Sequence, residues 1–543
     1  MNTAEALIKL LEKEGIDCVF GHPGEQILPF YKALSKSEIK HVLTRHEQGA
    51  AHACDAYGRS SGKYGVCVST AGPGAMNLVM GVATAFKDSV PMLVITGDND
   101  YSTFVDDKFQ SFPINDIFSK ITVKSFHPHT GRVAIRYMKE ALEILKKYPK
   151  GPVHINLSKD ILLDEDLGDI LDRDFEFIPN FDNLEDKFEE VIEKLNNSKR
   201  PLIIAGTGVI WGNSIDLLEE LSKEYNIPIT TTYQSKGIIS EEDELNLGIV
   251  GLRGDTCSDY AFLNSDCILV LGSRLSERTI AKAENYYKFK SKIIHINIDK
   301  KCLNGKLNIC QDVYNFLECL LNYNSLFKSY TLDVANKWID EIYQNYEEMI
   351  VDGINDDECE YSLLRPPYVI NKIINKFKGS YFLSDAGTHT TWTTLLSKSD
   401  KFGKLLFSGG FGPMGYGLPG AIGVAFAHPQ EKVVVICGDG DIQMVSQELA
   451  TIAEYDLNIS IFIINNSQLG IIRQWEDTIY DFDEHYQVDL KNPNFVKLAD
   501  AYNLKSFYVD NKDSLSLAIN ESYKNGPCLV DVNVIQEDIP MPK

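Results

Sequence analysis

The stretch that decides the fold is VVVICGDGDIQMVSQELATIAEYDLNISIFIINN, residues 433–466. Two apolar runs of strand length, VVVIC and ISIFII, enclose a segment in which Val445, Leu449 and Ile452 recur at helical spacing. This order predicts a strand, a helix and a second strand. Because such a crossover joins parallel strands, we expect the carboxyl ends of both strands at one edge of a sheet.

Polar residues follow both of these strands. Asp439 comes after the first strand between two glycines, and Asn466 ends the second strand. We therefore expect a carboxylate and an amide carbonyl to lie close together at the ligand-binding edge of the sheet. Such oxygen ligands suit Mg²⁺ or Ca²⁺, whose remaining ligands come from a phosphate and water. Gly438 and Gly440 let the backbone approach that phosphate.

Two other interpretations of GDGD are open. A GDG triplet by itself is often only a turn. A dinucleotide-binding fingerprint requires glycine at the position that Gln443 occupies, so the pattern does not fit that motif. The asparagine pair at 465–466, one helix later, is what favours a metal and phosphate site.

Composition limits the class of protein. At 543 residues the chain is too long for one hydrophobic core, and three domains are expected. A formal charge of -24 repels phosphate backbones and anionic lipid, so we predict no nucleic-acid partner and no membrane partner. The eleven cysteines include no CxxC pair, and the N-terminal segment MNTAEALIKLLEKEG does not resemble a signal peptide. We therefore predict a cytoplasmic protein with free thiols.

Apolar runs alternate with helical patterns along the chain. This rhythm predicts an α/β fold of three doubly wound domains with mainly parallel sheets, over residues 1–165, 186–328 and 360–543. An acidic segment at 164–186 is interpreted as a linker. The first and third domains share a size and a rhythm that indicate an internal duplication. The expected strands are DCVFG, KHVLT, YGVCVST, PMLVITG, PVHINLS, PLIIA, IPITTTY, CILVLGSR, KIIHINID, SYFLSDAG, KLLFSGG, KVVVICGDG, ISIFIINN and PCLVDVNVI.

The GDG and NN elements, at this interval, resemble the motif of thiamine diphosphate-dependent enzymes. The resemblance implies that Asp439, Asn466 and the main-chain carbonyl of Gln468 hold Mg²⁺ against the cofactor's diphosphate. It also requires a glutamate early in the chain, because a carboxyl group must protonate the pyrimidine ring. Glu47, in HVLTRHEQGAAHACDAYGR, follows a predicted strand and opens a predicted helix. A helix dipole alone would also favour an acid there, but the two features occur together and in the family's order.

Longer segments are similar to those of acetolactate synthase catalytic subunits. They are RHEQGAAHA, STAGPGAMNLV, DSVPMLVITG, SGGFGPMGYGLPGAIG, SQELATIAEYDL and LGIIRQW. The resemblance implies the thiamine diphosphate-binding fold, with the first and third domains alike. It also implies a transferase that decarboxylates pyruvate and ligates the hydroxyethyl fragment to a second 2-oxoacid, pyruvate or 2-oxobutyrate. This reaction serves the synthesis of branched-chain amino acids.

The site residues are carried over one position at a time. Phe109 and Gln110 match positions that line the substrate channel, and Met414 matches the residue that supports the bent cofactor. The expected catalytic residues are Glu47, Gln110, Lys124, Arg278 and Trp475, of which Arg278 binds the carboxylate of the second 2-oxoacid. The expected cofactor-binding residues are Pro73, Asn77, Gly387, Thr388, His389, Gly412, Met414, Gly438, Gly440, Asp441 and Gly470. The expected metal ligands are Asp439, Asn466 and Gln468.

The sequence also departs from the family pattern. Glu25 and Gln26 occupy a loop that usually has small residues, and Thr388 replaces a usual glutamine. GSRLSERT keeps both arginines of the flavin segment but lacks its paired aspartates, so FAD is expected only as an optional third cofactor.

A rival interpretation is a 2-oxoacid decarboxylase that releases an aldehyde without ligation. Such enzymes often carry two adjacent histidines, and His127 and His129 are close to that pattern. A third interpretation, a scaffold without catalysis, is disfavoured because Glu47, Asp439 and Asn466 are all present.

The resemblance has consequences for partners. The family's glutamate faces the diphosphate site of another subunit, which implies a homodimer or homotetramer. A small regulatory subunit is a further candidate partner, and small 2-oxoacids are the expected substrates.

Overall fold

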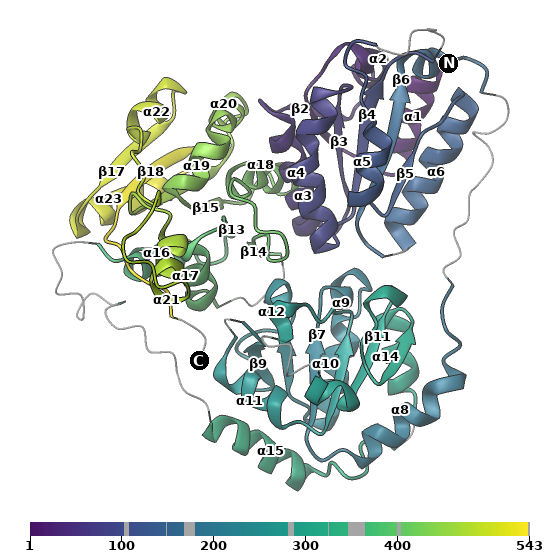
Figure 1. Cartoon of the computed structure of the whole chain (residues 1–543), viewed down its shortest axis with the longest axis vertical. Helices are drawn as coiled ribbons and strands as arrows, with labels where there is room; N and C mark the ends of the chain where they lie inside the picture. The colour runs from purple at the N-terminus through teal and green to yellow at the C-terminus, as the bar shows by residue number, and fades with distance from the viewer. Residues whose placement is uncertain are drawn as a thin grey trace. The chain divides into compact units, whose positions relative to one another are not determined.

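The computed structural model describes residues 1–101, 108–147, 149–167, 180–252, 254–280, 287–323, 325–345, 354, 364–398 and 403–540. These residues form three six-stranded sheets with helices between the strands, and the described strand pairings are parallel (Figure 1). We call each sheet with its helices the N-terminal, central or C-terminal domain. The predicted α/β fold with parallel sheets is confirmed. Residues 168–179 of the predicted linker lie outside the described residues.

The N-terminal sheet has the strand order β2-β1-β3-β4-β6-β5. Its inner strands are buried along nearly their whole length because helices cover both faces of the sheet. The strands are β1 (Cys18–Gly21), β2 (Lys40–Leu43), β3 (Gly65–Ser69), β4 (Met92–Asp98), β5 (Lys124–Phe126) and β6 (Pro152–Ser158). The helices are α1 (Thr3–Lys13), α2 (Leu28–Leu34), α3 (Glu47–Ser61), α4 (Pro73–Asp88), α5 (Ile114–Ile121), α6 (Gly131–Lys147) and α7 (Lys159–Leu163).

The C-terminal sheet repeats this topology, with the order β14-β13-β15-β16-β18-β17. The strands are β13 (Tyr381–Ser384), β14 (Leu405–Leu406), β15 (Val433–Gly438), β16 (Ile459–Asn465), β17 (Lys505–Val509) and β18 (Cys528–Asn533). The helices are α16 (Pro366–Lys376), α17 (Thr388–Leu396), α18 (Gly417–Ala427), α19 (Asp439–Val445), α20 (Leu449–Glu454), α21 (Gly470–Thr478), α22 (Phe495–Ala501) and α23 (Lys512–Ser522). The similar rhythm of the two sequences therefore corresponds to the same order of strands.

The N- and C-terminal domains form one compact unit. One hydrophobic core runs from the N-terminal sheet through α3 and α4 to α18 and the C-terminal sheet (Figure 1). Helices α3 and α18 cross at backbone contact, since a Cβ at Gly423 would lie 1.9 Å from the carbonyl oxygen of Ala53. Only glycine permits this approach. The two helices thereby fix the start of α3 relative to the C-terminal domain.

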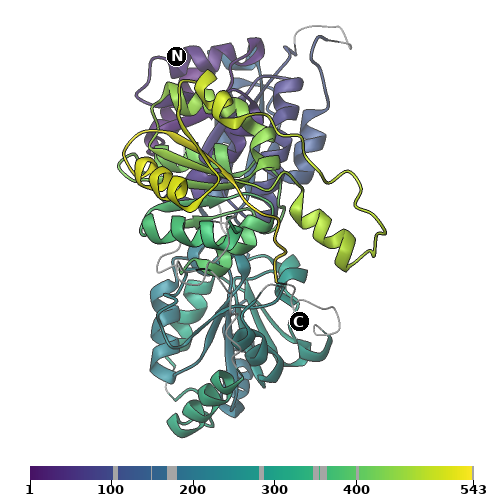
Figure 2. The same ribbon diagram turned by 90° about the vertical axis from the view of Figure 1, so that its left-hand side faces the viewer.

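The central domain belongs to a second compact unit. Its strand order β12-β11-β10-β7-β8-β9 is the doubly wound arrangement, with helices on both faces of the sheet (Figure 2). The strands are β7 (Pro201–Ala205), β8 (Ile229–Thr231), β9 (Asn246–Ile249), β10 (Cys267–Leu271), β11 (Ile293–Asn297) and β12 (Leu307–Cys310). The helices are α8 (Glu185–Asn197), α9 (Gly208–Trp211), α10 (Ile215–Tyr225), α11 (Thr256–Asn264), α12 (Glu277–Ile280), α14 (Val313–Leu321) and α15 (Leu332–Gln344).

Four strands were not among those expected from the sequence: β5, β9, β12 and β17. All four lie at an edge of their sheet, where a strand has only one neighbour. None of the helices in the described part of the chain combines the length and the apolar character needed to cross a membrane.

Candidate active site

The predicted metal ligands lie at the carboxyl ends of two adjacent strands. In the register of β15 and β16, Gly438 pairs with Ile464, so Asp439 and Asn466 leave the sheet side by side. This confirms the predicted neighbourhood of the two strand ends. The Asp439 side chain is buried at 2% exposure, and burial raises its pKa to about 6. A carboxylate in this setting is stabilised by a cation.

Gln468 presents its main-chain groups toward Asn466. Its N–H donates to Asn466 Oδ1 at 3.1 Å. Residues on either side of it pair with the segment 488–490, through Leu469 N to Val488 O and Leu490 N to Ser467 O. Gln468 and Asp489 thus form a non-hydrogen-bonded pair of an antiparallel bridge. The N–H and C=O of Gln468 therefore point away from the segment 488–490. Its carbonyl oxygen is therefore open to a ligand on the side of Asn466.

Two buried side-chain atoms beside these residues have no hydrogen-bond partner in the part of the chain that the structure describes. They are His389 Nε2 and Asp441 Oδ1, although His389 Nε2 lies 3.3 Å from Asp441 Oδ2. Burial lowers the pKa of His389 to about 3 and raises that of Asp441, while Gly438 N–H donates to Asp441 Oδ2 at 2.8 Å. Buried polar groups are normally satisfied, so these two atoms mark a place where a polar ligand could bind. A diphosphate with Mg²⁺ fits this set of donors and acceptors.

Glycines at the same edge let neighbouring side chains pack closely against the backbone. A Cβ at Gly440 would lie 2.9 Å from Met414 Cε, and one at Gly470 would lie 2.9 Å from Asn466 Nδ2. Thr388 opens α17 near Gly470, and Gly387 precedes it. The N-termini of α17 and α21 add positive potential to this edge. These contacts bring together most of the predicted cofactor-binding residues of the C-terminal domain: Gly387, Thr388, His389, Met414, Gly438, Gly440, Asp441 and Gly470. Gly412 lies two positions before Met414 in the chain.

Two buried aspartates hold the turn that carries Gly412 and Met414. Asp385, at the end of β13, accepts hydrogen bonds from the N–H groups of Gly415, Tyr416 and Gly417 at 2.8 to 3.1 Å. Asp88, from the N-terminal domain, accepts from Gly410 N–H at 2.9 Å. Neither residue was predicted. SDAG, an acid at the end of an expected strand, was the available signal for Asp385, while nothing local marks Asp88.

Asn492 is a further residue that sequence reasoning missed. Its side-chain nitrogen donates to Asp439 Oδ2 at 2.6 Å and to Asn465 Oδ1 at 3.0 Å. Its oxygen accepts from Gln443 Nε2 at 3.0 Å, which fixes the orientation of the amide. Asn492 therefore holds one oxygen of Asp439 in place.

The predicted residues of the N-terminal domain form a second group. Glu47 starts α3 after β2, and Asn77 lies in the first turns of α4 after β3. Asn77 Nδ2 donates to Glu47 Oε2 at 2.9 Å, and a Cβ at Gly74 would lie 3.1 Å from Glu47 Oε1. Pro73 begins the same helix. Glu47 is thus a buried carboxyl group with an amide partner and no cation at hydrogen-bond distance among the described residues.

The residues predicted to line the substrate channel lie in different parts of the N-terminal domain. Gln110 packs against the start of α4, since a Cβ at Gly72 would lie 2.5 Å from its carbonyl oxygen. Phe109 is exposed. Lys124 begins edge strand β5, pairs in register with Val153 near the start of β6, and forms an ion pair with Glu140. Because Lys124 lies toward the amino ends of the strands, the structure does not bring it to the edge that carries Glu47.

Arg278 and Trp475 lie in different units. Arg278 is an exposed residue of α12, where its carbonyl accepts from Leu252 N–H at 2.7 Å and its guanidinium lies 5.9 Å from the ring of Tyr233. Trp475 is half-buried in α21, which begins beside Asn466. The structure therefore places Trp475 near the metal-ligand candidates and Arg278 on the central domain.

Glu25 and Gln26, which depart from the family pattern, and the histidine pair of the rival interpretation lie in the N-terminal domain. Glu25 is exposed and pairs with Lys159 at 3.5 Å, whereas Gln26 is buried. The rings of His127 and His129 lie 5.2 Å apart at the end of edge strand β5, with His127 Nε2 3.4 Å from Asp98. They do not lie beside Glu47 in the strand order.

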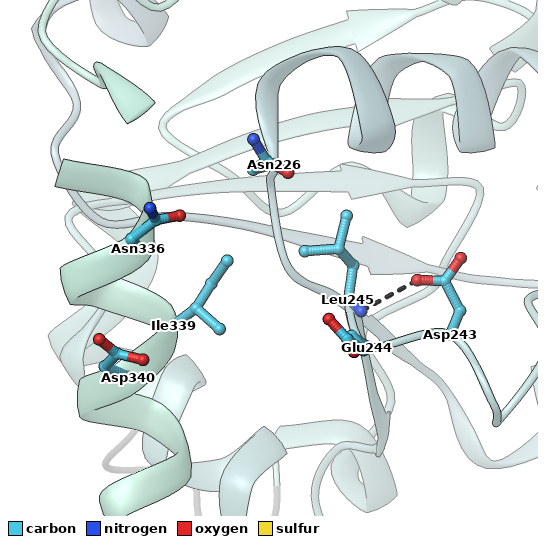
Figure 3. Close-up of a pocket in the computed structure, with 7 residues that line it drawn as sticks. All are labelled: Asn226, Asp243, Glu244, Leu245, Asn336, Ile339 and Asp340. Atoms are coloured by element: carbon cyan, nitrogen blue, oxygen red, sulfur yellow. Dashed lines mark hydrogen bonds between the residues drawn. The ribbon is translucent and has the colours of Figure 1, made fainter. Parts of the chain in front are cut away.

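A cavity of about 550 Å³ lies elsewhere, in the central domain. Figure 3 shows α15 on one side of it and the loop 243–245 on the other. Leu245 N–H donates to Asp243 Oδ1 at 3.0 Å within this loop. The lining residues are Asn226, Asp243, Glu244, Leu245, Asn336, Ile339 and Asp340, none of which was predicted as a site residue.

Comparisons with known proteins cover nearly the whole chain. Residues 1–117, 188–320 and 385–532 match the N-terminal TPP binding domain, the central domain and the C-terminal TPP binding domain of thiamine pyrophosphate enzymes. A probable acetolactate synthase large subunit of Methanocaldococcus jannaschii is 36% identical over 98% of this chain and 92% of that protein. The acetolactate synthase large subunit of Porphyra purpurea is 35% identical, with the same two coverages. That of Lactococcus lactis is 32% identical over 99% of this chain and 93% of that protein. The chain therefore belongs to the thiamine pyrophosphate enzymes and, within them, to the family of acetolactate synthase large subunits.

Proposed function

We propose that this protein is the catalytic subunit of an acetolactate synthase. It joins the two-carbon fragment left by decarboxylation of pyruvate to a second 2-oxoacid, either pyruvate or 2-oxobutyrate. The observation that carries the proposal is similarity over nearly the full length to enzymes of that name, in a chain with a buried Asp439 and a separate buried Glu47. Thiamine diphosphate would supply the electron sink for the decarboxylation.

Asp439, Asn466 and the carbonyl of Gln468 would hold Mg²⁺. A hard cation bound by few protein oxygens takes further ligands from phosphate, so this set would fix the diphosphate of the cofactor. The positive charge of the cation would compensate the negative charge of the buried carboxylates at this edge. His389 Nε2, which has no hydrogen-bond partner among the described residues, would donate a hydrogen bond to the diphosphate.

Glu47 would hold and return a proton at the pyrimidine ring nitrogen. Its contact with Asn77 fixes the orientation of the carboxyl group, and the surrounding side chains exclude water. The apolar wall of the site, to which Met414 contributes, would favour loss of the substrate's carboxylate charge.

Arg278 would bind the carboxylate of the acceptor 2-oxoacid, because a guanidinium forms two parallel hydrogen bonds with a carboxylate. Trp475 would cover the acceptor's alkyl group. Decarboxylation and ligation together neither oxidise nor reduce the substrates, so the reaction requires no redox step. FAD, if bound, would have a structural role in the central domain.

A second copy of the chain would complete the site. Among the described residues, no hydrogen bond or ion pair connects Glu47, Asn77 or Pro73 with the metal-ligand set. Helix α4, whose first turns contact Glu47, carries an exposed apolar side chain, Met80, at 43% exposure. A homodimer that covers this face would bring Glu47 of one chain to the diphosphate edge of the other. A small regulatory subunit is a further partner that the relatives' designation as large subunits supports.

Product analysis tests the function. The enzyme is incubated with pyruvate, thiamine diphosphate and Mg²⁺, with and without 2-oxobutyrate and with and without FAD. We expect 2-acetolactate from pyruvate alone and the mixed acetohydroxy acid when 2-oxobutyrate is added. Acetaldehyde as the only product would show a decarboxylase that does not ligate and would contradict the proposal.

A further inference from the structure

The turn that carries Glu47 rests on a side chain of the C-terminal domain. Glu448, between α19 and α20, is completely buried at 0% exposure. Its carboxylate accepts hydrogen bonds from Arg45 N–H at 3.0 and 3.2 Å and from His46 N–H at 2.9 Å. Thr451 Oγ1 donates to it at 2.7 Å. These donors satisfy a carboxylate that would otherwise be costly to bury.

Glu448 also lies against Gly49, in the first turn of α3 on the other side of Glu47. A Cβ at Gly49 would lie 2.4 Å from Glu448 Oε1. The carboxylate therefore fills the space in front of Gly49 while it binds the amides of residues 45 and 46. Glu47 lies between these contacts in the sequence, so its backbone is fixed from both sides.

Further contacts connect the end of β2 with the C-terminal domain. Arg45 forms an ion pair with Glu454 at 2.5 Å, and Leu43 N–H donates to the hydroxyl of Tyr455 at 3.1 Å. His46 Nδ1 accepts from Gln48 N–H at 3.1 Å and caps the start of α3. The segment 43–49 of the N-terminal domain is thus seated on the segment 448–455 of the C-terminal domain.

We propose that Glu448 is the positioning residue for Glu47: it fixes the backbone turn from which the Glu47 side chain projects, without touching substrate or cofactor. The proposal rests on the proposed function for the role of Glu47. A displacement of about 1 Å at a reacting group can lower a rate about 100-fold, so a buried anchor for this turn is expected to matter for kcat. Loss of the anchor should leave the binding of pyruvate nearly unchanged, because the substrate does not contact Glu448.

The test begins with Glu448→Gln, which keeps the size of the side chain but replaces one acceptor oxygen with an NH₂ group facing the same N–H donors. Hydrogen–deuterium exchange of the full chain without cofactor is followed in the peptide that contains residues 43–49. We expect faster exchange of the Arg45 and His46 amides. This readout does not depend on activity.

The catalytic part of the test is a double-mutant cycle. Glu448→Gln should lower kcat about 10- to 100-fold, with KM for pyruvate changed less than about twofold. In the Glu47→Gln background the same substitution should lower the residual rate less than about twofold, because residues that act through one group are not additive. An equal loss in both backgrounds would overturn the proposal.

Matched controls separate positioning from general destabilisation. Ser460→Ala removes the hydrogen bond from Ser460 Oγ to Ser522 O, 2.7 Å long and buried at the start of β16 in the same domain. We expect it to leave both the exchange of 43–49 and kcat unchanged. Thr451→Val removes one donor to Glu448 but leaves Arg45 and His46 in place, and should have a smaller effect than Glu448→Gln.

If Glu448→Gln does not fold, Gly49→Ala perturbs the same contact from the opposite side and serves as the second variant. Unchanged exchange at 43–49, or unchanged kcat with faster exchange, would overturn the proposal. Absence of acetolactate from the wild-type protein would instead contradict the proposed function, and the exchange result would still decide whether Glu448 holds the turn.

Discussion

The N- and C-terminal domains have the same strand order but opposite chemistry at the carboxyl ends of their strands. The N-terminal edge carries Glu47, whose carboxyl group is paired with the neutral amide of Asn77. The C-terminal edge carries buried Asp385, Asp439 and Asp441 at the ends of adjacent strands. One edge therefore carries a single carboxyl group with an amide partner, and the other carries several buried carboxyl groups. The topology provides the position, and the loop residues determine the chemistry.

The two edges also differ in how they are supported. The turn before Glu47 is held by Glu448 of the other domain, and the turn around Met414 is held by Asp385 of its own domain and Asp88 of the other. Each edge thus depends on side chains from both domains. The comparison predicts that substitutions at one edge affect proton transfer, whereas those at the other affect metal and cofactor binding.

Glu47→Gln should have the largest effect. The amide cannot transfer the proton, so kcat should fall on the order of 10³-fold or more, near the upper range for a single acid–base group. Glu14→Gln, directly after α1, is the control and should retain full activity. Steady-state kinetics and thermal unfolding are the measurements. A variant with unaltered kcat would remove Glu47 from the proposed proton transfer.

Asp439→Asn should act on binding instead. Loss of a hydrogen-bond partner of a metal ligand lowers metal affinity roughly 10- to 100-fold. Removing the carboxylate ligand itself should lower the affinity for Mg²⁺ at least as much. Titration of the protein with Mg²⁺ at fixed thiamine diphosphate, followed by tryptophan fluorescence, measures this affinity. Exposed Asp500→Asn in the same domain is the control. Equal Mg²⁺ affinity in the Asp439 variant and the wild type would refute the assigned metal site.

Asn492→Ala sharpens the comparison within the C-terminal edge. It removes the 2.6 Å hydrogen bond to Asp439 but leaves all three proposed ligands in place. We expect the Mg²⁺ affinity to fall about tenfold, the lower end of such effects. Restoration of affinity in Asn492→Gln would be compatible with the hydrogen bond as its cause. No loss in the alanine variant would mean that Asp439 needs no such support.

A smaller effect concerns stability in acid. Burial lowers the pKa of His154, in the N-terminal sheet, to about 3, and this ring contacts the hydroxyls of Thr96 and Ser125, each at 2.8 Å. The unfolded chain binds a proton below about pH 6.5 and the folded chain does not, so stability falls as the pH falls from 6.5 toward 3, by up to about 1.4 kcal/mol per pH unit.

The slope of the free energy of unfolding against pH is proportional to the number of protons that the chain takes up on unfolding. His154→Gln should therefore lower this number by about one between pH 6 and 4. Urea unfolding at several pH values measures the slope. The absolute stability of the variant is not the test, because loss of the two hydroxyl contacts lowers it at every pH. An unchanged slope would show that the proton is not excluded from this ring in the folded state.

The sequence was sufficient for the inner strands and insufficient for the edges of the sheets. Strands such as β15 and β16 are covered on both faces, so they appear as uninterrupted apolar runs. Edge strand β17 has only one buried residue, and β5 has only three residues. Their formation depends on pairing with β18 and β6, which no local pattern reveals.

The site shows the same limit. Asp439 and Asn466 could be predicted as neighbours because one crossover fixes their separation. Glu448 and Arg45, by contrast, are 403 positions apart in the chain and meet only when two domains pack together. Asn492 lies in a loop whose contact with Asp439 has no periodic signal. Lys124, chosen by resemblance alone, lies toward the other end of its strand.

Coexpression of the Glu47→Gln and Asp439→Asn chains tests most directly whether the two edges form one site across two chains. In a dimer that combines Glu47 of one chain with Asp439 of the other, each mixed dimer has one intact site. We therefore predict recovery of about a quarter of the wild-type acetolactate synthesis when the chains mix freely, although each variant alone is nearly inactive. No recovery in isolated mixed dimers would contradict the shared site.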